Sequence, residues 1–242
     1  MSSLADNLAH LEEGIRAACQ RAGRDRGSVE LMAVSKTYPA PVLAEAASLG
    51  LLLFGENRVQ EYADKGPELA ALRGASLPPV RVHLIGHLQS NKALRAVELF
   101  DGIDSVDSLK LAERLNSAAA ERNKTLPILL EVKLSPEESK AGLDPTSAGA
   151  AQLLERLPEL SHLRMQGLMT IAPFGVPEEE TRACFRSLRE WQNRWAQSCP
   201  RLDFSVLSMG MSGDFELAIE EGATRVRVGT SLVGRRPALV AR

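Results

Sequence analysis

Residues 29–58 read VELMAVSKTYPAPVLAEAASLGLLLFGENR, and this stretch indicates the fold. It contains two short apolar runs, at residues 29–34 and 51–54, on either side of a helical pattern. Both runs are continuous rather than alternating, which is typical of parallel strands that are buried on both faces. The stretch therefore predicts a strand, a crossover helix and a second parallel strand.

The same alternation continues to the end of the chain. Six further apolar or β-rich runs follow, at residues 80–85, 103–106, 128–132, 165–171, 204–207 and 225–228. Eight strands alternating with helices over 242 residues match the (β/α)8 barrel in count and length. We therefore predict an α/β protein with a single TIM-type barrel domain over residues 1–242, and a doubly wound open sheet is the alternative.

Several helix starts can be predicted from local signals. Ser108 precedes an apolar stripe at helical spacing, and Pro177 precedes three glutamates, which favour a helix N-terminus. Asp144, which is followed by proline, and Asp214 are further predicted N-caps.

The first and last segments of the chain are expected to lie together. Apolar residues at helical spacing predict an amphipathic helix near residues 2–22. Only about a dozen residues follow the last strand, which is too few for a full eighth helix. We therefore expect the extra N-terminal helix to cover the flank of the barrel that an eighth helix would protect.

Composition excludes several classes of protein. The chain is 44% hydrophobic and 25% charged, with a formal net charge of −2, so we expect a globular protein with no nucleic-acid partner. No apolar run is long enough to span a bilayer, and the first residues lack the features of a signal peptide. The three cysteines form no CxxC motif. We therefore expect a cytoplasmic protein that does not bind membranes.

Polar residues follow five of the predicted strands, and active sites of barrels form at those strand ends. The segments are 35–37, 55–58, 86–92, 208–214 and 229–231. Lys36 follows the first strand and would project into a largely apolar mouth, where desolvation lowers the pKa of a lysine and favours its nucleophilic form. A solvated loop lysine is the alternative.

A phosphate site is predicted on the same rim. Gly229 and Thr230, together with the small residues at 208–213, supply backbone N–H groups and hydroxyls where barrels of this kind commonly hold a phosphate. Each segment alone could also be an ordinary turn. An amine and a phosphate site on one rim suggest a phosphorylated carbonyl compound as the ligand.

Arg227 lies within the last strand and is expected to point into the barrel, where an unpaired charge is unfavourable. If the ligand is pyridoxal phosphate, its ring nitrogen could accept from this arginine, and protein groups near that atom tune the cofactor. An internal salt bridge with a barrel carboxylate such as Glu131 is the alternative. Other chemistry is less well supported. His83 and His87 are spaced across a strand and a turn, so no metal site is expected. No GxSxG sequence supports a hydrolase triad.

Six motifs occur in order over residues 32–235. They are AVSKT at 33–37, FGENRVQE at 54–61, IGHLQSNK at 85–92, GLMTI at 167–171, LSMGMS at 207–212 and VRVGT at 226–230. Together they resemble the pyridoxal phosphate homeostasis protein family. That resemblance implies a barrel akin to the N-terminal domain of bacterial alanine racemase, with pyridoxal 5′-phosphate as its cofactor.

The resemblance also implies roles for individual residues. Lys36 would carry the cofactor as an internal aldimine, Asn57 would contact the ring, Arg227 would face its nitrogen, and Ser208, Gly229 and Thr230 would hold the phosphate. A lysine in the position of Lys140 is implied to have a secondary part in cofactor handling. The implied protein is a monomer that holds the cofactor, or passes it to apo-enzymes, without catalytic residues or turnover.

Two catalytic alternatives stay open. A pyridoxal phosphate-dependent amino-acid racemase, or a related fold-type III enzyme, needs acid–base groups on both faces of its substrate. Lys36 could serve one face, but whether Tyr38 reaches the other is left open by the sequence. The chain ends at Arg242, just past the last strand, which favours a carrier. The second alternative is an aldolase-like barrel without the cofactor, in which Lys36 binds a sugar phosphate.

Overall fold

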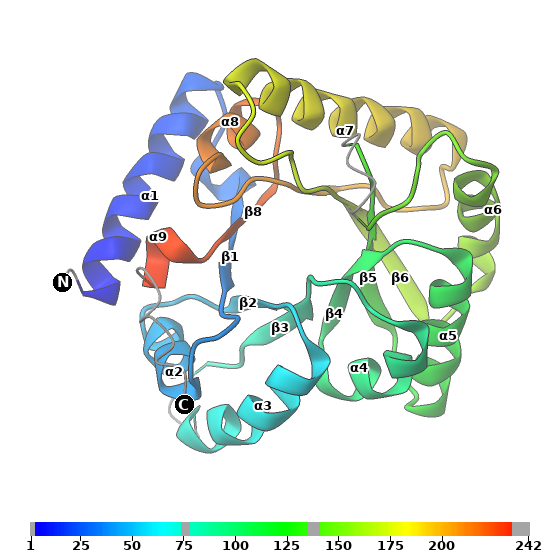
Figure 1. Cartoon of the computed structure of the whole chain (residues 1–242), viewed down its shortest axis with the longest axis horizontal. Coiled ribbons are helices and arrows are strands. Elements are labelled where there is room, and N and C mark those ends of the chain that lie inside the picture. The colour runs from blue at the N-terminus through cyan, green and yellow to red at the C-terminus, as the bar shows by residue number, and fades with distance from the viewer. Residues whose placement is uncertain (1–2, 74–77, 135–140, 234–242) are drawn as a thin grey trace.

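The computed structural model describes residues 3–73, 78–134 and 141–233, and its eight strands form a closed parallel barrel (Figure 1). The strands are β1 (Glu30–Val34), β2 (Leu53–Glu56), β3 (Arg81–Leu84), β4 (Gly102–Val106), β5 (Leu126–Glu131), β6 (Leu163–Met169), β7 (Val206–Ser208) and β8 (Arg225–Val228). Each strand pairs with the next, and β8 pairs back with β1, where Met32 lies opposite Arg227. The prediction of a TIM-type barrel is therefore confirmed, and the open sheet is excluded.

Helices surround the barrel in the ring that Figure 1 shows. They are α1 (Leu4–Arg21), α2 (Ala40–Ser48), α3 (Val59–Arg73), α4 (Ala93–Leu99), α5 (Leu109–Glu121), α6 (Ala148–Arg156), α7 (Glu178–Ser198), α8 (Phe215–Glu220) and α9 (Thr230–Val233). The outward-facing apolar residues of the strands and the inner faces of these helices form one large core cluster. Burial on both faces explains why the strands read as continuous apolar runs.

The predicted helix starts are confirmed in part. Ser108 caps α5 by accepting a hydrogen bond from the Leu111 N–H, and Pro177 is the N-cap residue of α7. The predicted cap at Asp144 is wrong, because Ser147 caps α6 instead. Asp144 accepts from the backbone N–H of Thr146, two residues on, and so closes a turn that precedes the helix.

The N-terminal helix covers the flank of the barrel beside α8 and α9, as predicted. In Figure 1, α1 lies beside α8 and α9, and it packs against both. Its buried stripe includes Leu11, Ile15 and Ala18, and Ser3 begins it with a capping box. Through this stripe, α1 supplies apolar cover beside α8 and α9.

Ile15→Asp is expected to lower the stability of the protein strongly. Arg16→Asp, on the exposed side of the same helical turn, is the matched control. Ile15 is fully buried between α1 and the barrel, so a carboxylate there would lose its hydration without gaining a partner. We expect a loss of at least about 3 kcal/mol in the free energy of unfolding, from urea denaturation. Equal stability of the two variants would contradict the covering role of α1.

The amino end of the barrel is closed by a buried ionic layer. Arg225 contacts Asp104 at 3.1 Å and Glu30 at 2.8 Å, and His83 Nδ1 lies 2.8 Å from the second oxygen of Asp104. Above this layer lies a small apolar cluster, made of Met32, Val34, Leu53 and Ile85. The barrel interior is therefore filled at that end, and open space lies at the carboxyl ends of the strands.

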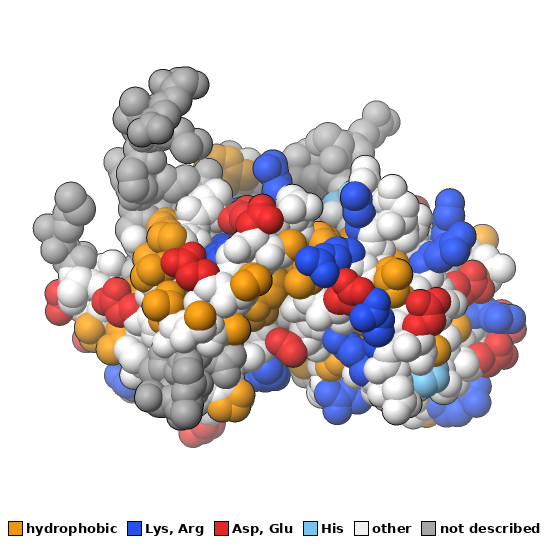
Figure 2. Space-filling model, turned by 90° about the horizontal axis from the view of Figure 1, so that it is seen from below, with side chains coloured by type: hydrophobic (Ala, Val, Ile, Leu, Met, Phe, Trp, Pro, Cys, Tyr) orange, Lys and Arg blue, Asp and Glu red, His pale blue; other side chains and the backbone are white. Residues whose placement is uncertain are grey.

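The outer surface carries charges of both signs. Figure 2 shows this surface from below: hydrophobic side chains gather in the left half of the view, and blue and red side chains are interspersed in the right half. Among the ion pairs of the outer surface, Arg95 and Arg122 both contact Glu98. The right half of this face therefore offers no continuous field of one sign. Among the helices of the described ranges, none combines the length and apolar character needed to cross a membrane.

Candidate functional site at the barrel mouth

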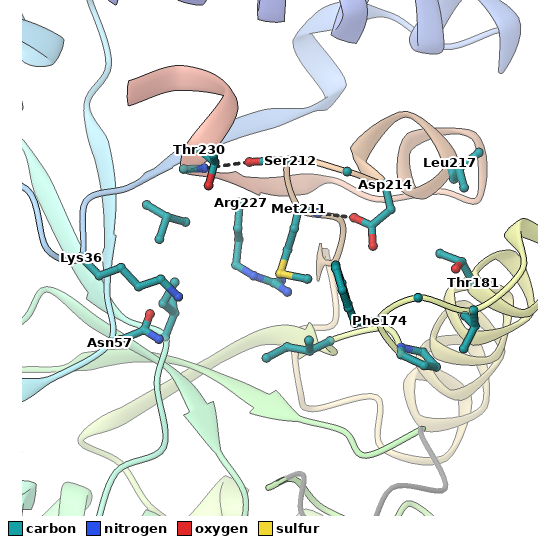
Figure 3. A pocket seen from close by; sticks show the side chains of 18 of the residues that line it. Lys36, Asn57, Phe174, Thr181, Met211, Ser212, Asp214, Leu217, Arg227 and Thr230 are labelled. Atoms are coloured by element: carbon teal, nitrogen blue, oxygen red, sulfur yellow. Dashed lines mark hydrogen bonds between the residues drawn. The ribbon is translucent and has the colours of Figure 1, made fainter. Parts of the chain in front are cut away.

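A cavity of about 580 Å³ lies at the carboxyl ends of the strands (Figure 3). Five of the six predicted site residues line it, namely Lys36, Asn57, Arg227, Gly229 and Thr230. In Figure 3, Lys36 and Asn57 lie together on one side, and Arg227 points into the space from β8. Residues far apart in the sequence therefore meet at the one place where a barrel normally holds its ligand.

Lys36 is carried by a tight turn that follows β1. The turn runs from Ser35 to Tyr38 and is closed by a hydrogen bond of 3.1 Å from the Tyr38 N–H to the Ser35 carbonyl oxygen. Thr37 has a φ of +68°, which is uncommon for a β-branched residue. This turn directs the half-buried side chain of Lys36 into the cavity.

Glu56 does not lie at the mouth, although the sequence suggested that residues 55–58 converge there. Its side chain is fully buried outside the barrel, where Oε1 accepts from Lys65 Nζ at 2.7 Å and from Ser35 Oγ at 2.6 Å. Burial raises the pKa of Glu56, and the hydrogen bonds from Lys65 and Ser35 oppose that rise. Because successive residues at a strand end point to opposite sides, Asn57 then points into the cavity.

Gly86 allows the end of β3 to pass close to Asn57. A Cβ atom at position 86 would lie 2.2 Å from the carbonyl oxygen of Asn57, which is far inside van der Waals contact. Any side chain at this position would therefore displace the segment that carries Asn57. The glycine in the motif at 85–92 is thus explained by the packing of one site segment on another.

Arg227 is buried and points inward, as predicted. Its guanidinium donates from Nη1 to Ser208 Oγ and from Nη2 to the Thr170 carbonyl oxygen, each at 2.8 Å. Burial lowers its pKa, and the carboxylates of Asp104, Glu131 and Asp214 oppose that shift. The alternative of an ion pair with Glu131 is wrong, because the described contacts of Arg227 do not include one.

Ser208 lies behind Arg227 rather than on the cavity wall. It is fully buried, and its described side-chain contact is the hydrogen bond that it accepts from Arg227. The structure therefore gives Ser208 a part in orienting the arginine. Its predicted contact with a phosphate stays a prediction.

Backbone donors converge at the rim near Thr230. The N–H groups of Gly229 and Ser231 both point at Ser212 Oγ, at the long distances of 3.3 and 3.4 Å. Figure 3 shows Ser212 and Thr230 on the same wall of the cavity. A Cβ on Gly229 would lie only 3.2 Å from the Val34 carbonyl oxygen, so glycine suits this position. These donors form a corner that can bind an anionic oxygen.

A second cavity of about 240 Å³ adjoins the first and shares Asn57, Ile85 and Ile171 with it. Glu131 lines it and is only 6% exposed, and its Oε2 has no hydrogen-bond partner within the described part of the chain. Burial, together with the negative charge of Asp107, raises the pKa of Glu131 to about 7, although Arg227 and His87 oppose the rise. This carboxyl group therefore titrates near neutral pH.

Glu131→Gln is expected to stabilise the protein at pH 8 but not at pH 4.5. Since the folded state binds the proton of Glu131 more tightly than the unfolded chain, stability falls as the pH rises from about 4.5 to about 7. The full difference corresponds to at most about 3 kcal/mol. Urea denaturation at both pH values measures it, with the exposed Glu155→Gln as control. An effect of Glu131→Gln that is equal at both pH values would contradict this titration.

Several lining residues were not singled out from the sequence. The loop between β6 and α7 contributes Phe174, which is 95% exposed at the rim, and α7 and α8 contribute Thr181 and Leu217. The rule that found the other residues could have found Phe174, since its loop also follows a strand. Tyr38, the residue left open for a racemase, is not among the residues that line the cavity. Lys140 lies outside the described residues.

The chain is similar to proteins of one family over nearly its full length. The family model for the alanine racemase N-terminal domain matches residues 7–237. A pyridoxal phosphate homeostasis protein of Pseudomonas aeruginosa is 43% identical over 236 residues, which cover 98% of this chain and 97% of that protein. The protein of the same name from Vibrio cholerae is 41% identical over 245 residues, with 98% of each chain covered.

A solved structure is similar as well. PipY of Synechococcus elongatus PCC7942, with PLP bound, shares 44% identity with this chain and superposes with a TM-score of 0.83. The similarity covers 96% of this chain and 100% of the PipY chain.

Proposed function

Since this chain belongs to the pyridoxal phosphate homeostasis protein family, which has the alanine racemase N-terminal domain, we propose that it binds pyridoxal 5′-phosphate (PLP) at the barrel mouth and keeps it available for other proteins. The observation that supports this most is the set of groups in one cavity. A primary amine, an inward-pointing arginine and an anion-binding corner all line it. Those groups match an aldehyde, a pyridine nitrogen and a phosphate.

The residues fit the cofactor in the following way. Lys36 binds the aldehyde carbon covalently through its amine, with loss of one water. Asn57 contacts the ring, and the Gly229–Thr230 corner holds the phosphate. Loss of the long hydrogen bonds to Ser212 would release two backbone N–H groups for phosphate oxygens. When bound, the cofactor supplies an aldehyde that amines trap reversibly.

Arg227 would make bound PLP a weaker electron sink. An arginine stays charged in proteins, so facing the ring nitrogen it discourages protonation of that nitrogen and weakens the cofactor as an electron sink. The two tyrosines of the chain also lie elsewhere: Tyr38 is not on the cavity wall, and Tyr62 packs on Phe100 with ring centroids 5.1 Å apart. We therefore propose a non-catalytic, monomeric and cytoplasmic holder of PLP, built as a single domain over residues 1–242, whose recipients are apo-enzymes that need PLP.

The absorption spectrum of the purified protein, after incubation with PLP and gel filtration, tests this proposal. We expect a yellow protein whose near-visible band disappears on borohydride treatment, with the added mass on Lys36. Addition to an apo-enzyme should restore that enzyme's activity. A colourless protein would end the proposal and favour the aldolase-like alternative, and interconversion of D- and L-amino acids would favour the racemase.

A further inference from the structure

A lysine from α3 reaches the turn that carries Lys36. Lys65 Nζ donates to the carbonyl oxygens of Ser35 at 3.0 Å and Tyr38 at 2.9 Å, which are the first and last residues of that turn. The side chain of Lys65 is only 7% exposed. An ammonium group has three donors, and the third goes to Glu56 Oε1 at 2.7 Å.

The same cluster binds the turn at further points. Glu56 also accepts from Ser35 Oγ, and Glu61 on α3 accepts from the Thr37 N–H. The Lys65 ammonium lies 3.5 Å from Glu61 Oε1, so both carboxylates belong to one charged cluster. Residues on both sides of Lys36 are therefore fixed from β2 and α3. Because Glu56 directly precedes Asn57, the cluster also joins the two segments that bear the proposed cofactor contacts.

The cluster is an unusual way to stabilise a fold. Two buried charges lose much of their hydration, and a pair of apolar side chains of the same size is often at least as stable. Glu56 Oε2 has no hydrogen-bond partner among the residues that the structure describes. In return, the ammonium satisfies two turn carbonyls next to Thr37, whose left-handed backbone must be held by its surroundings. These contacts favour a function in shaping the turn.

We propose that Lys65, held by Glu56, is a positioning residue that fixes the turn of Lys36 and thereby sets where the Lys36 amine lies in the cavity. The inference deepens the proposed function. The affinity test below rests on PLP binding, whereas the hydrogen-exchange test does not. Lys65 itself does not line the cavity, so its effect on the ligand passes through Lys36.

Hydrogen exchange in the absence of ligand tests the positioning directly. In Lys65→Met, we expect the Tyr38 N–H, which closes the turn, to exchange at least about tenfold faster than in the unmodified protein. Lys124→Met is the matched control, because Lys124 Nζ likewise donates to two carbonyl oxygens, those of Val97 and Phe100, but away from the turn. Since Glu56 without its partner could prevent folding, Lys65→Met combined with Glu56→Gln is the second variant.

Two ligands test the consequence for the site. PLP can bond to Lys36, whereas pyridoxine 5′-phosphate has an alcohol in place of the aldehyde and cannot. We expect Lys65→Met to weaken PLP binding about tenfold and to leave the affinity for pyridoxine 5′-phosphate unchanged, while Lys124→Met changes neither. The affinities are measured by fluorescence titration.

Each outcome decides the inference. Faster exchange at Tyr38 with a selective loss of PLP affinity supports it. The inference is overturned by unchanged exchange at Tyr38, by an unchanged affinity for PLP, or by an equal loss of affinity for both ligands, which would indicate a structural role. If the unmodified protein does not bind PLP but Lys65→Met still speeds exchange at Tyr38, the proposed function fails and the positioning of Lys36 stands.

Discussion

Lys36→Ala abolishes the covalent retention of PLP: this is the largest effect on PLP binding that we expect from a single substitution. The variant keeps Asn57, Arg227 and the anion-binding corner, so it still binds PLP, but only non-covalently. We expect no near-visible band from a lysine linkage and no added mass after borohydride treatment. We also expect at least about a hundredfold weaker retention, equivalent to about 3 kcal/mol.

The control for this experiment is Lys110→Ala, which removes an exposed lysine from α5. It should match the unmodified protein in spectrum and in retention of PLP. Gel filtration followed by release of bound PLP in alkali measures the retained amount. A Lys36→Ala protein that still gains the mass of PLP on reduction would show that another lysine binds the aldehyde.

Arg227→Leu is expected to cause a large loss of stability. The substitution leaves Ser208 Oγ and the Thr170 carbonyl oxygen without the donors that they now have. It also removes the positive charge that opposes the raised pKa values of Glu131 and Asp214. Breaking a buried charged network of this kind costs about 3–5 kcal/mol.

Urea denaturation at pH 8 measures this loss, with Arg164→Leu on the exposed part of β6 as the control. The loss should shrink toward pH 5, because protonated carboxyl groups no longer need the positive charge. A loss below about 1 kcal/mol at pH 8, or one that does not vary with pH, would show that Arg227 is not the counter-charge of this network.

The barrel and most of its mouth could be predicted because they depend on patterns along the chain. Continuous apolar runs report burial on both faces, and the residues that follow them must gather at one end. Lys36 and Gly229 are such residues. Their assignment to PLP came from the family motifs, since an amine and a small-residue turn fit many phosphorylated carbonyl compounds.

The remaining features depend on contacts that no local pattern encodes. Nothing in the sequence near Lys65 indicates that its amine reaches the turn of Lys36. Ser208 lies behind Arg227 because β7 and β8 pair side by side, which sets their register. The carboxylate of Asp144 closes a turn and does not cap α6. An aspartate is favoured in both positions, so the sequence alone does not distinguish a turn from a helix cap.

The filled amino end of the barrel has a consequence for delivery. The ionic layer around Arg225 and Asp104, with the apolar cluster above it, leaves no passage along the barrel axis. A ligand that enters the cavity at the carboxyl ends of the strands must therefore leave through the same opening. Under the proposed function, an enzyme that took PLP directly from this protein would have to dock over that opening, and uptake and direct transfer would then exclude each other in time.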